Sequence, residues 1–65
     1  MAHYQTIAEI QSEKNALQQK LSALNTFISS PTYSTLLPAE QQLLQQQKNI
    51  MQQYVSVLDD RLAAR

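Results

Sequence analysis

The chain contains no cysteine and no glycine, and only two prolines, in 65 residues. Without cysteine it has no disulfide, and a single histidine, His3, argues against a structural zinc site or any other metal site. Sixty-five residues form one domain at most, and chains this short usually need a disulfide, a metal or self-association to be stable. Self-association is the remaining route, and we expect it here.

Charge and long apolar runs are also scarce. Five basic and five acidic residues give a formal net charge of zero, which argues against a protein that binds duplex nucleic acid through a basic surface. The balance leaves room for a small anionic ligand held by two or three local cations. No apolar run approaches the length of a membrane span, and the first residues lack the basic and apolar regions of a signal peptide. We therefore expect a cytoplasmic protein without a membrane partner.

The residue types that catalyse reactions are missing as a set. The chain has no cysteine nucleophile, no histidine paired with a nucleophile, no glycine-rich phosphate loop and no cluster of metal ligands. Asp59 and Asp60 form an acidic pair, but Arg61 follows directly and argues against a catalytic dyad. We therefore expect no enzymatic activity and no cofactor.

Apolar residues recur at helical spacing in two segments that a Ser-Pro break separates. The first helix is predicted over about 4–29, with the spacing of a capping box at Thr6 and Glu9. Its apolar positions follow at steps of three or four residues once one polar position, Lys14, is included, which is the spacing of a heptad seam. These apolar positions are Ile7, Ile10, Leu17, Leu21, Leu24 and Ile28.

The break and a second proline place the second helix. The residue before a proline avoids the helical region, so the first helix ends before Pro31. A connector is predicted over 30–37, and Pro38 suits the first position of a second helix over about 38–64. The two helices then form an antiparallel hairpin. The predicted seam of the second helix is Leu44, Gln47, Met51, Tyr54, Leu58 and Arg61.

The second helix carries a broader apolar stripe than one partner helix can cover. Leu43, Ile50 and Val57 form a second line at seven-residue spacing, and Val55 and Leu62 flank the other side of the seam. The predicted fold class is therefore all-α: a two-helix antiparallel hairpin that assembles into a homo-oligomeric helical bundle. The predicted interface residues are Leu43, Ile50, Met51, Val55, Val57 and Leu62.

Several polar residues are candidates for binding a ligand. In an antiparallel hairpin Lys14, Tyr54 and Arg61 gather toward the open end, with Arg65 beyond them. Cations beside an aromatic ring can hold a phosphate and stack on a base. Each residue also has a purely structural interpretation. Lys14 reaches solvent or specifies the register, Tyr54 packs in the core with a solvated hydroxyl, and Arg61 pairs with an acid or with the helix end.

Three groups of residues occur in an order that points to a known family. The sequence resembles the small helical-hairpin proteins of bacteriophages that share a domain with the anti-CBASS and anti-Thoeris sponges. The resemblance covers nearly the whole chain, from about Ile10 to Arg61. The residues that carry it most specifically are Glu13-Lys14, then Glu40-Gln41 followed by Leu43-Leu44, and then Tyr54, Leu58 and Arg61.

The resemblance implies a ligand and an assembly. Such sponges form compact oligomers, often hexamers, and sequester cyclic oligonucleotide or cyclic ADP-ribose-type second messengers, so that the bacterial defence effector is not activated. An aromatic residue near the N-terminus stacks on a base, and a helix lysine holds phosphate across a boundary between chains. Tyr4 and Lys20 suit those roles in this sequence, with Lys14 and Arg61 as second choices. The structural alternatives are a tail position for Tyr4 and a solvated flank for Lys20.

The leading hypothesis is therefore a phage sponge that binds a cyclic nucleotide signal without cleaving it. The alternative is a protein–protein interaction module whose apolar stripe is completed by a helix of a host or phage protein. A closed homo-oligomer of the purified chain favours the sponge, whereas a small, unstable species favours the module. A nucleic-acid-binding regulator is the weakest of the three hypotheses because the charge is balanced.

Overall fold

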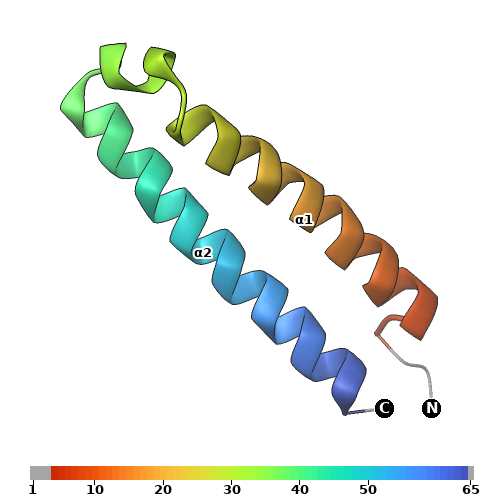
Figure 1. The fold of residues 1–65 in the computed structure, drawn as a ribbon. Coiled ribbons are helices and arrows are strands. Elements are labelled where there is room, and N and C mark those ends of the chain that lie inside the picture. Colours follow the sequence, from red (N-terminus) through yellow and green to blue (C-terminus); the bar gives the residue numbers. More distant parts are fainter. Residues whose placement is uncertain (1–3, 65) are drawn as a thin grey trace.

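The computed structural model describes residues 4–64 as two long helices joined by a short connector (Figure 1). Helix α1 spans Ile7–Ile28, a 3₁₀ helix η1 spans Pro31–Thr35, and α2 spans Pro38–Ala63. The two long helices lie side by side and run antiparallel, so the first turn of α1 and the last turn of α2 share one end (Figure 1). This arrangement confirms the all-α hairpin. His3 and Arg65, which the sequence analysis considered, lie outside the described residues.

Helix α1 begins at Ile7 because Thr6 caps it. Thr6 has an extended backbone, its hydroxyl accepts a hydrogen bond from the Glu9 N–H (3.1 Å), and the Glu9 carboxylate accepts one from the Thr6 N–H (2.9 Å). This capping box satisfies backbone donors that a helix start otherwise leaves unpaired. The backbone N–H of Thr6, and then the Thr6 side chain, lower the pKa of the Glu9 carboxyl by hydrogen bonding to it. Residues 4–6, which the predicted helix of 4–29 included, therefore precede α1.

Tyr33 and Gln41 hold the closed end of the hairpin together. The Tyr33 hydroxyl donates to the Gln41 carbonyl (3.1 Å), and Gln41 Nε2 donates to the carbonyl oxygens of Tyr33 (3.1 Å) and Leu36 (3.0 Å). The Phe27 ring meets the Tyr33 ring edge to face, with centroids 6.4 Å apart. These contacts hold η1 against the first turn of α2, where Pro38 needs no backbone N–H.

Helix α1 packs on α2 along the heptad seam that its sequence predicts. Ile10 is fully buried, and Lys14 occupies the next seam position. The part-buried residues that continue the seam are Leu17, Leu21, Leu24 and Ile28. Ile7, which was predicted to begin this seam, is 54% exposed. Ile7 lies one helical turn before Ile10, closer to the open end of the hairpin. At that level α2 is in its last turn and offers few side chains for Ile7 to pack against.

The residues of α2 that pack on α1 differ in part from those predicted. Leu58 is fully buried, while Gln47 and Tyr54, which were predicted to lie in the seam, are exposed. Val55 and Leu62, which were assigned to the oligomer interface, are part-buried at seam spacing. Burying these two aliphatic side chains avoids the desolvation of a glutamine amide and a tyrosine hydroxyl. The seam as the structure has it is Gln41, Leu44, Lys48, Met51, Val55, Leu58 and Leu62.

The hairpin is a thin rod that leaves much of its apolar surface exposed. Its extents are 50 × 17 × 16 Å. Its accessible surface of 4852 Å² exceeds the roughly 4,200 Å² expected for a folded monomer of 7.4 kDa. Leu43, Ile50 and Val57 are 63, 57 and 50% exposed, and their seven-residue spacing places them on one face of α2. These three residues are called the apolar line below, and they remain available for a partner.

Candidate ligand-binding site

The open end of the hairpin brings together residues from three parts of the chain. The Arg61 guanidinium lies over the Tyr4 ring, 5.6 Å from its centroid, and Nη1 of Arg61 donates to the side-chain oxygen of Gln5 at 2.8 Å. The Gln5 amide nitrogen donates in turn to the Glu13 carboxylate at 3.0 Å. The segment before α1 is thereby held on the last turns of α2. Arg61 therefore contacts Tyr4 and Gln5 and forms no ion pair within residues 4–64, although it lies in the last turn of α2, as one structural interpretation expected.

Glu13 and Tyr54 join the two helices beside that contact. The Tyr54 hydroxyl donates a hydrogen bond to the Glu13 carboxylate. This bond, followed by the one from Gln5 and the nearby charge of Arg61, holds the pKa of the Glu13 carboxyl below its ordinary value. The same bond raises the pKa of the Tyr54 hydroxyl. Tyr54 is 41% exposed, so its ring faces solvent while its hydroxyl is engaged.

These pKa shifts predict how stability depends on pH. The pKa of Glu13 is lower in the folded than in the unfolded chain. The stability that the Glu13 carboxylate contributes is therefore complete above its unfolded pKa and is lost as the pH falls through its folded pKa. The pKa of Tyr54 is higher in the folded than in the unfolded chain. The stability that the Tyr54 hydroxyl contributes is therefore complete below its unfolded pKa and is lost as the pH rises through its folded pKa. We expect Tyr54→Phe to weaken both dependences.

The measurement is the thermal midpoint by circular dichroism, at one protein concentration, from about pH 3 to pH 11. The difference between the parent and Tyr54→Phe should be largest at neutral pH and shrink toward both extremes. Glu9→Gln is the control. It removes the loss of stability at low pH that the Glu9 carboxyl causes, and it leaves the dependence on Glu13 and Tyr54 unchanged. A constant difference across the pH range would contradict the assignment of these shifts to the Glu13–Tyr54 bond.

Lys14 is the lysine of the α1 seam, and it pairs with Asp59 of α2. The side chain of Lys14 is 20% exposed and that of Asp59 is 49% exposed. The lysine therefore crosses the seam, and the aspartate neutralises its charge. This geometry matches the register role proposed for Lys14 more closely than a role in holding phosphate.

Lys20 lies far from Tyr4 in the same chain. Thirteen residues separate Lys20 from Ile7 at the start of α1, which corresponds to about 20 Å along a helix. Lys20 is exposed and forms no ion pair within residues 4–64. It lies one heptad after Glu13, which contacts Tyr54, and so it shares the flank of the hairpin that carries Tyr54. One chain does not bring together the two residues to which the resemblance assigns the base and the phosphate.

Glu13 and Gln5 take part in the open-end contacts, although neither was predicted to do so. Glu13 carries a readable signal, because it flanks the α1 seam directly before Lys14 and faces the flanking position of α2 in an antiparallel pair. Gln5 carries none, because it precedes the helix and helical periodicity does not place it. Over the described residues there is no group of three or more potential metal ligands, and no helix is long and apolar enough to cross a membrane.

The described chain is thus a narrow helical hairpin whose open end presents the exposed Tyr4 ring and the guanidinium of Arg61. The model of the Sequestin family matches residues 4–64, and the chain belongs to this family. The family name points to the sequestering of other molecules, which is a binding role. No curated protein and no solved structure matches the chain significantly.

Proposed function

We propose that this protein is a phage sponge that sequesters cyclic oligonucleotide or cyclic ADP-ribose-type immune second messengers in the host cytoplasm, without cleaving them. The observation that carries the proposal is the contact of Arg61 with Tyr4, in a chain of the Sequestin family. Tyr4 is 88% exposed, so the ring face opposite Arg61 is open to a base. A base stacked on Tyr4 would leave its phosphate within the field of the guanidinium.

A second copy of the chain completes the site in this proposal. Lys20 shares a flank with Tyr54, and Ile50 and Val57 of the apolar line lie one helical turn to either side of Tyr54. A hairpin that packs on the apolar line therefore approaches the flank that presents Lys20. Full burial of a valine, leucine or isoleucine side chain stabilises by about 1.5–3 kcal/mol, so three such residues per chain can drive association. The resemblance favours a hexamer.

Binding alone is sufficient for this function if the protein outnumbers the messenger and binds it more tightly than the effector does. A sub-micromolar dissociation constant corresponds to about −8 kcal/mol. Charge-assisted hydrogen bonds contribute roughly 1.5–3 kcal/mol each and a stacked base about 1–3 kcal/mol, less the entropy of association. A few cations and one or two aromatic rings, contributed by more than one chain, reach that range.

The test is native mass spectrometry of the purified protein, with and without a panel of cyclic dinucleotides, cyclic trinucleotides and cyclic ADP-ribose isomers. We expect a closed oligomer that gains a fixed number of one ligand. Tyr4→Ala and Lys20→Ala should each weaken binding by about tenfold or more, equivalent to about 1.4 kcal/mol, and keep the oligomer. Gln53→Ala, at an exposed position of α2, is the control that should bind like the parent.

Two results would contradict the proposal at different levels. An oligomer that stays unliganded across the panel would overturn the sponge function. Tyr4→Ala and Lys20→Ala variants that both bind like the parent would overturn the site assignment and leave the function standing.

A protein–protein interaction module is the second candidate, and the exposed apolar line favours it. Leu43, Ile50 and Val57 have the spacing that receives a foreign amphipathic helix. The oligomeric state of the purified chain separates the two candidates. A chain that stays a single hairpin at micromolar concentration, and binds no ligand of the panel, supports the module.

A further inference from the structure

Gln5 stands between a cation and an anion at the open end of the hairpin. Its side-chain oxygen accepts a hydrogen bond from Nη1 of Arg61 (2.8 Å), and its side-chain nitrogen donates one to Oε1 of Glu13 (3.0 Å). One neutral amide therefore separates the guanidinium from the carboxylate. Within residues 4–64, Arg61 and Glu13 form no ion pair.

The second oxygen of the Glu13 carboxylate is also engaged by a neutral donor. The Tyr54 hydroxyl donates to Oε2 of Glu13, so each carboxylate oxygen has a partner without charge. The pKa of the Glu13 carboxyl is lowered first by the bond from Tyr54, then by that from Gln5, and also by the nearby charge of Arg61. Arg61 is therefore near enough to attract Glu13, although the two do not pair.

This arrangement leaves most of the Arg61 guanidinium for another partner. A guanidinium has five N–H donors, and the contacts of this one in the described chain are the Tyr4 ring, 5.6 Å from the centroid, and the bond to Gln5. A bidentate pair with Glu13 would use two donors and neutralise the charge. The Gln5 amide uses one donor and leaves the charge in place.

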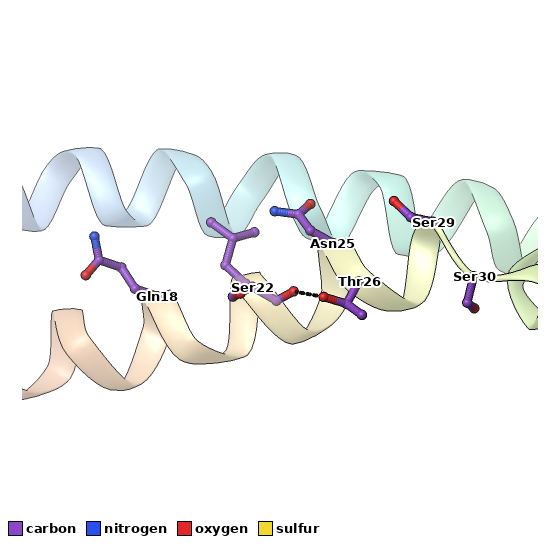
Figure 2. Close-up of a pocket in the computed structure, with 7 residues that line it drawn as sticks. Gln18, Ser22, Asn25, Thr26, Ser29 and Ser30 are labelled. Atoms are coloured by element: carbon purple, nitrogen blue, oxygen red, sulfur yellow. Dashed lines mark hydrogen bonds between the residues drawn. The ribbon is translucent and has the colours of Figure 1, made fainter.

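A hollow on α1 offers an anion no comparable cation. Figure 2 shows this hollow, which has a volume of about 730 Å³. Its lining residues all lie between Gln18 and Ser30, on α1 and directly after it, and none of them is charged. An anion in the hollow would meet amides and hydroxyls alone, whereas at the open end it would meet the guanidinium of Arg61.

We propose that Gln5 is a positioning residue whose amide keeps Glu13 from pairing with Arg61, and so leaves the guanidinium on the Tyr4 ring available to a phosphate of the ligand. An amide suits this role because it accepts from the guanidinium and donates to the carboxylate at the same time, without a charge of its own. The identity of the anion as a phosphate of a nucleotide rests on the proposed function, whereas the separation of the two charges does not.

Gln5→Ala tests the separation without any ligand. Once the amide is removed, Glu13 should close on Arg61, and the direct ion pair should lower the pKa of the Glu13 carboxyl further. If Gln5 is only a hydrogen-bond donor to Glu13, its loss should instead raise that pKa toward the ordinary value. The two results have opposite signs, and a pH titration of the Glu13 carboxyl carbon signal by solution NMR distinguishes them. A raised pKa in Gln5→Ala would overturn the proposal.

Inorganic pyrophosphate, followed by the Nε–Hε signal of Arg61 in solution NMR, tests the consequence for anion binding. Gln5→Ala should weaken binding about threefold, a factor typical of competition by an exposed ion pair. The double variant Gln5→Ala, Glu13→Gln should bind at least as well as the parent, because no carboxylate is left to compete. Gln53→Ala makes the same side-chain change at an exposed position of α2 and should bind like the parent.

The double variant separates the proposed role from a loss of order. If Gln5→Ala acts only by loosening the segment that carries Tyr4, the added Glu13→Gln change should not restore binding. A double variant as weak as Gln5→Ala, or a parent whose Arg61 signal does not respond to pyrophosphate, would therefore overturn the proposal. Gln5 precedes α1, so these variants should keep the parent's helical content, which circular dichroism checks.

The nucleotide panel separates this inference from the proposed function. If Gln5→Ala lowers the pKa of Glu13 and weakens pyrophosphate binding, but no nucleotide binds the parent, the role of Gln5 stands and the sponge function fails. If a nucleotide binds equally well to the parent and to Gln5→Ala, the sponge function stands and the role of Gln5 fails.

Discussion

Leu58→Ala should leave the chain largely unfolded at temperatures where the parent is folded. Leu58 and Ile10 are the fully buried side chains among the described residues, so the seam depends on them. Truncation of a buried leucine to alanine destabilises by about 2–5 kcal/mol. A chain of this length has a total stability of roughly 3–10 kcal/mol, so the loss is a large fraction of the whole. Removing the Leu58 side chain would also leave a cavity beside Lys14, whose part-buried methylene groups pack against apolar neighbours.

The measurement is thermal and urea unfolding by circular dichroism, at one protein concentration. Leu37→Ala is the matched control, because it makes the same chemical change at a side chain that is 67% exposed and lies outside the apolar line. We expect this control to change stability by no more than about 0.5 kcal/mol. Equal losses in the two variants would show that the seam is not the part of the hairpin that stabilises it.

If chains associate through the apolar line, as proposed, Ile50→Glu should convert the assembly into single hairpins that keep their helical content. Ile50 is the middle residue of the apolar line and is 57% exposed in one chain, so the seam does not need it. Glutamate is a good helix former, and α2 should therefore persist. In an interface between chains, the carboxylate would be removed from water without a partner, which is strongly unfavourable. We expect the dissociation constant of the assembly to rise at least about a hundredfold, or 2.7 kcal/mol.

Sedimentation velocity over a range of concentrations gives the mass of each species. Gln52→Glu is the matched control, because it adds the same charge at an exposed position of α2 two residues from Ile50, which places it on nearly the opposite side of the helix from the apolar line. This control should keep the mass of the parent. An Ile50→Glu variant that remains assembled would exclude the apolar line as the contact between chains.

The local features of the hairpin follow from residues close together in the sequence. The capping box of Thr6 and Glu9 places the start of α1, and Pro31 and Pro38 place the end of α1 and the start of α2. These signals act over three or four residues, through backbone hydrogen bonds and the fixed geometry of proline, and they need no partner helix. The α1 seam is equally readable, because its apolar residues form a single stripe one helix wide.

The α2 seam depended on the tertiary structure. Its apolar stripe contains two possible seams, which share Leu44, Met51 and Leu58. One of them adds Gln47 and Tyr54, the other Val55 and Leu62, and only packing against α1 distinguishes them. By spacing alone, Gln47 and Tyr54 were predicted to lie in the seam, and Val55 and Leu62 in an interface between chains, although the hairpin itself partly covers Val55 and Leu62.

In the candidate site, too, the residue types follow from the sequence, whereas the contacts between them follow from the packing of the helices. The sequence alone determined which residue types are present: three tyrosines, five cations and no catalytic or metal-binding set. The register of the two helices decided which of them meet, so that Lys14 pairs with Asp59, and Tyr4 contacts Arg61 rather than Lys20. Periodicity specifies the face of a helix on which a side chain lies. The partner across the seam depends on how far one helix is displaced along the other, and that displacement is set by the sum of all contacts between them.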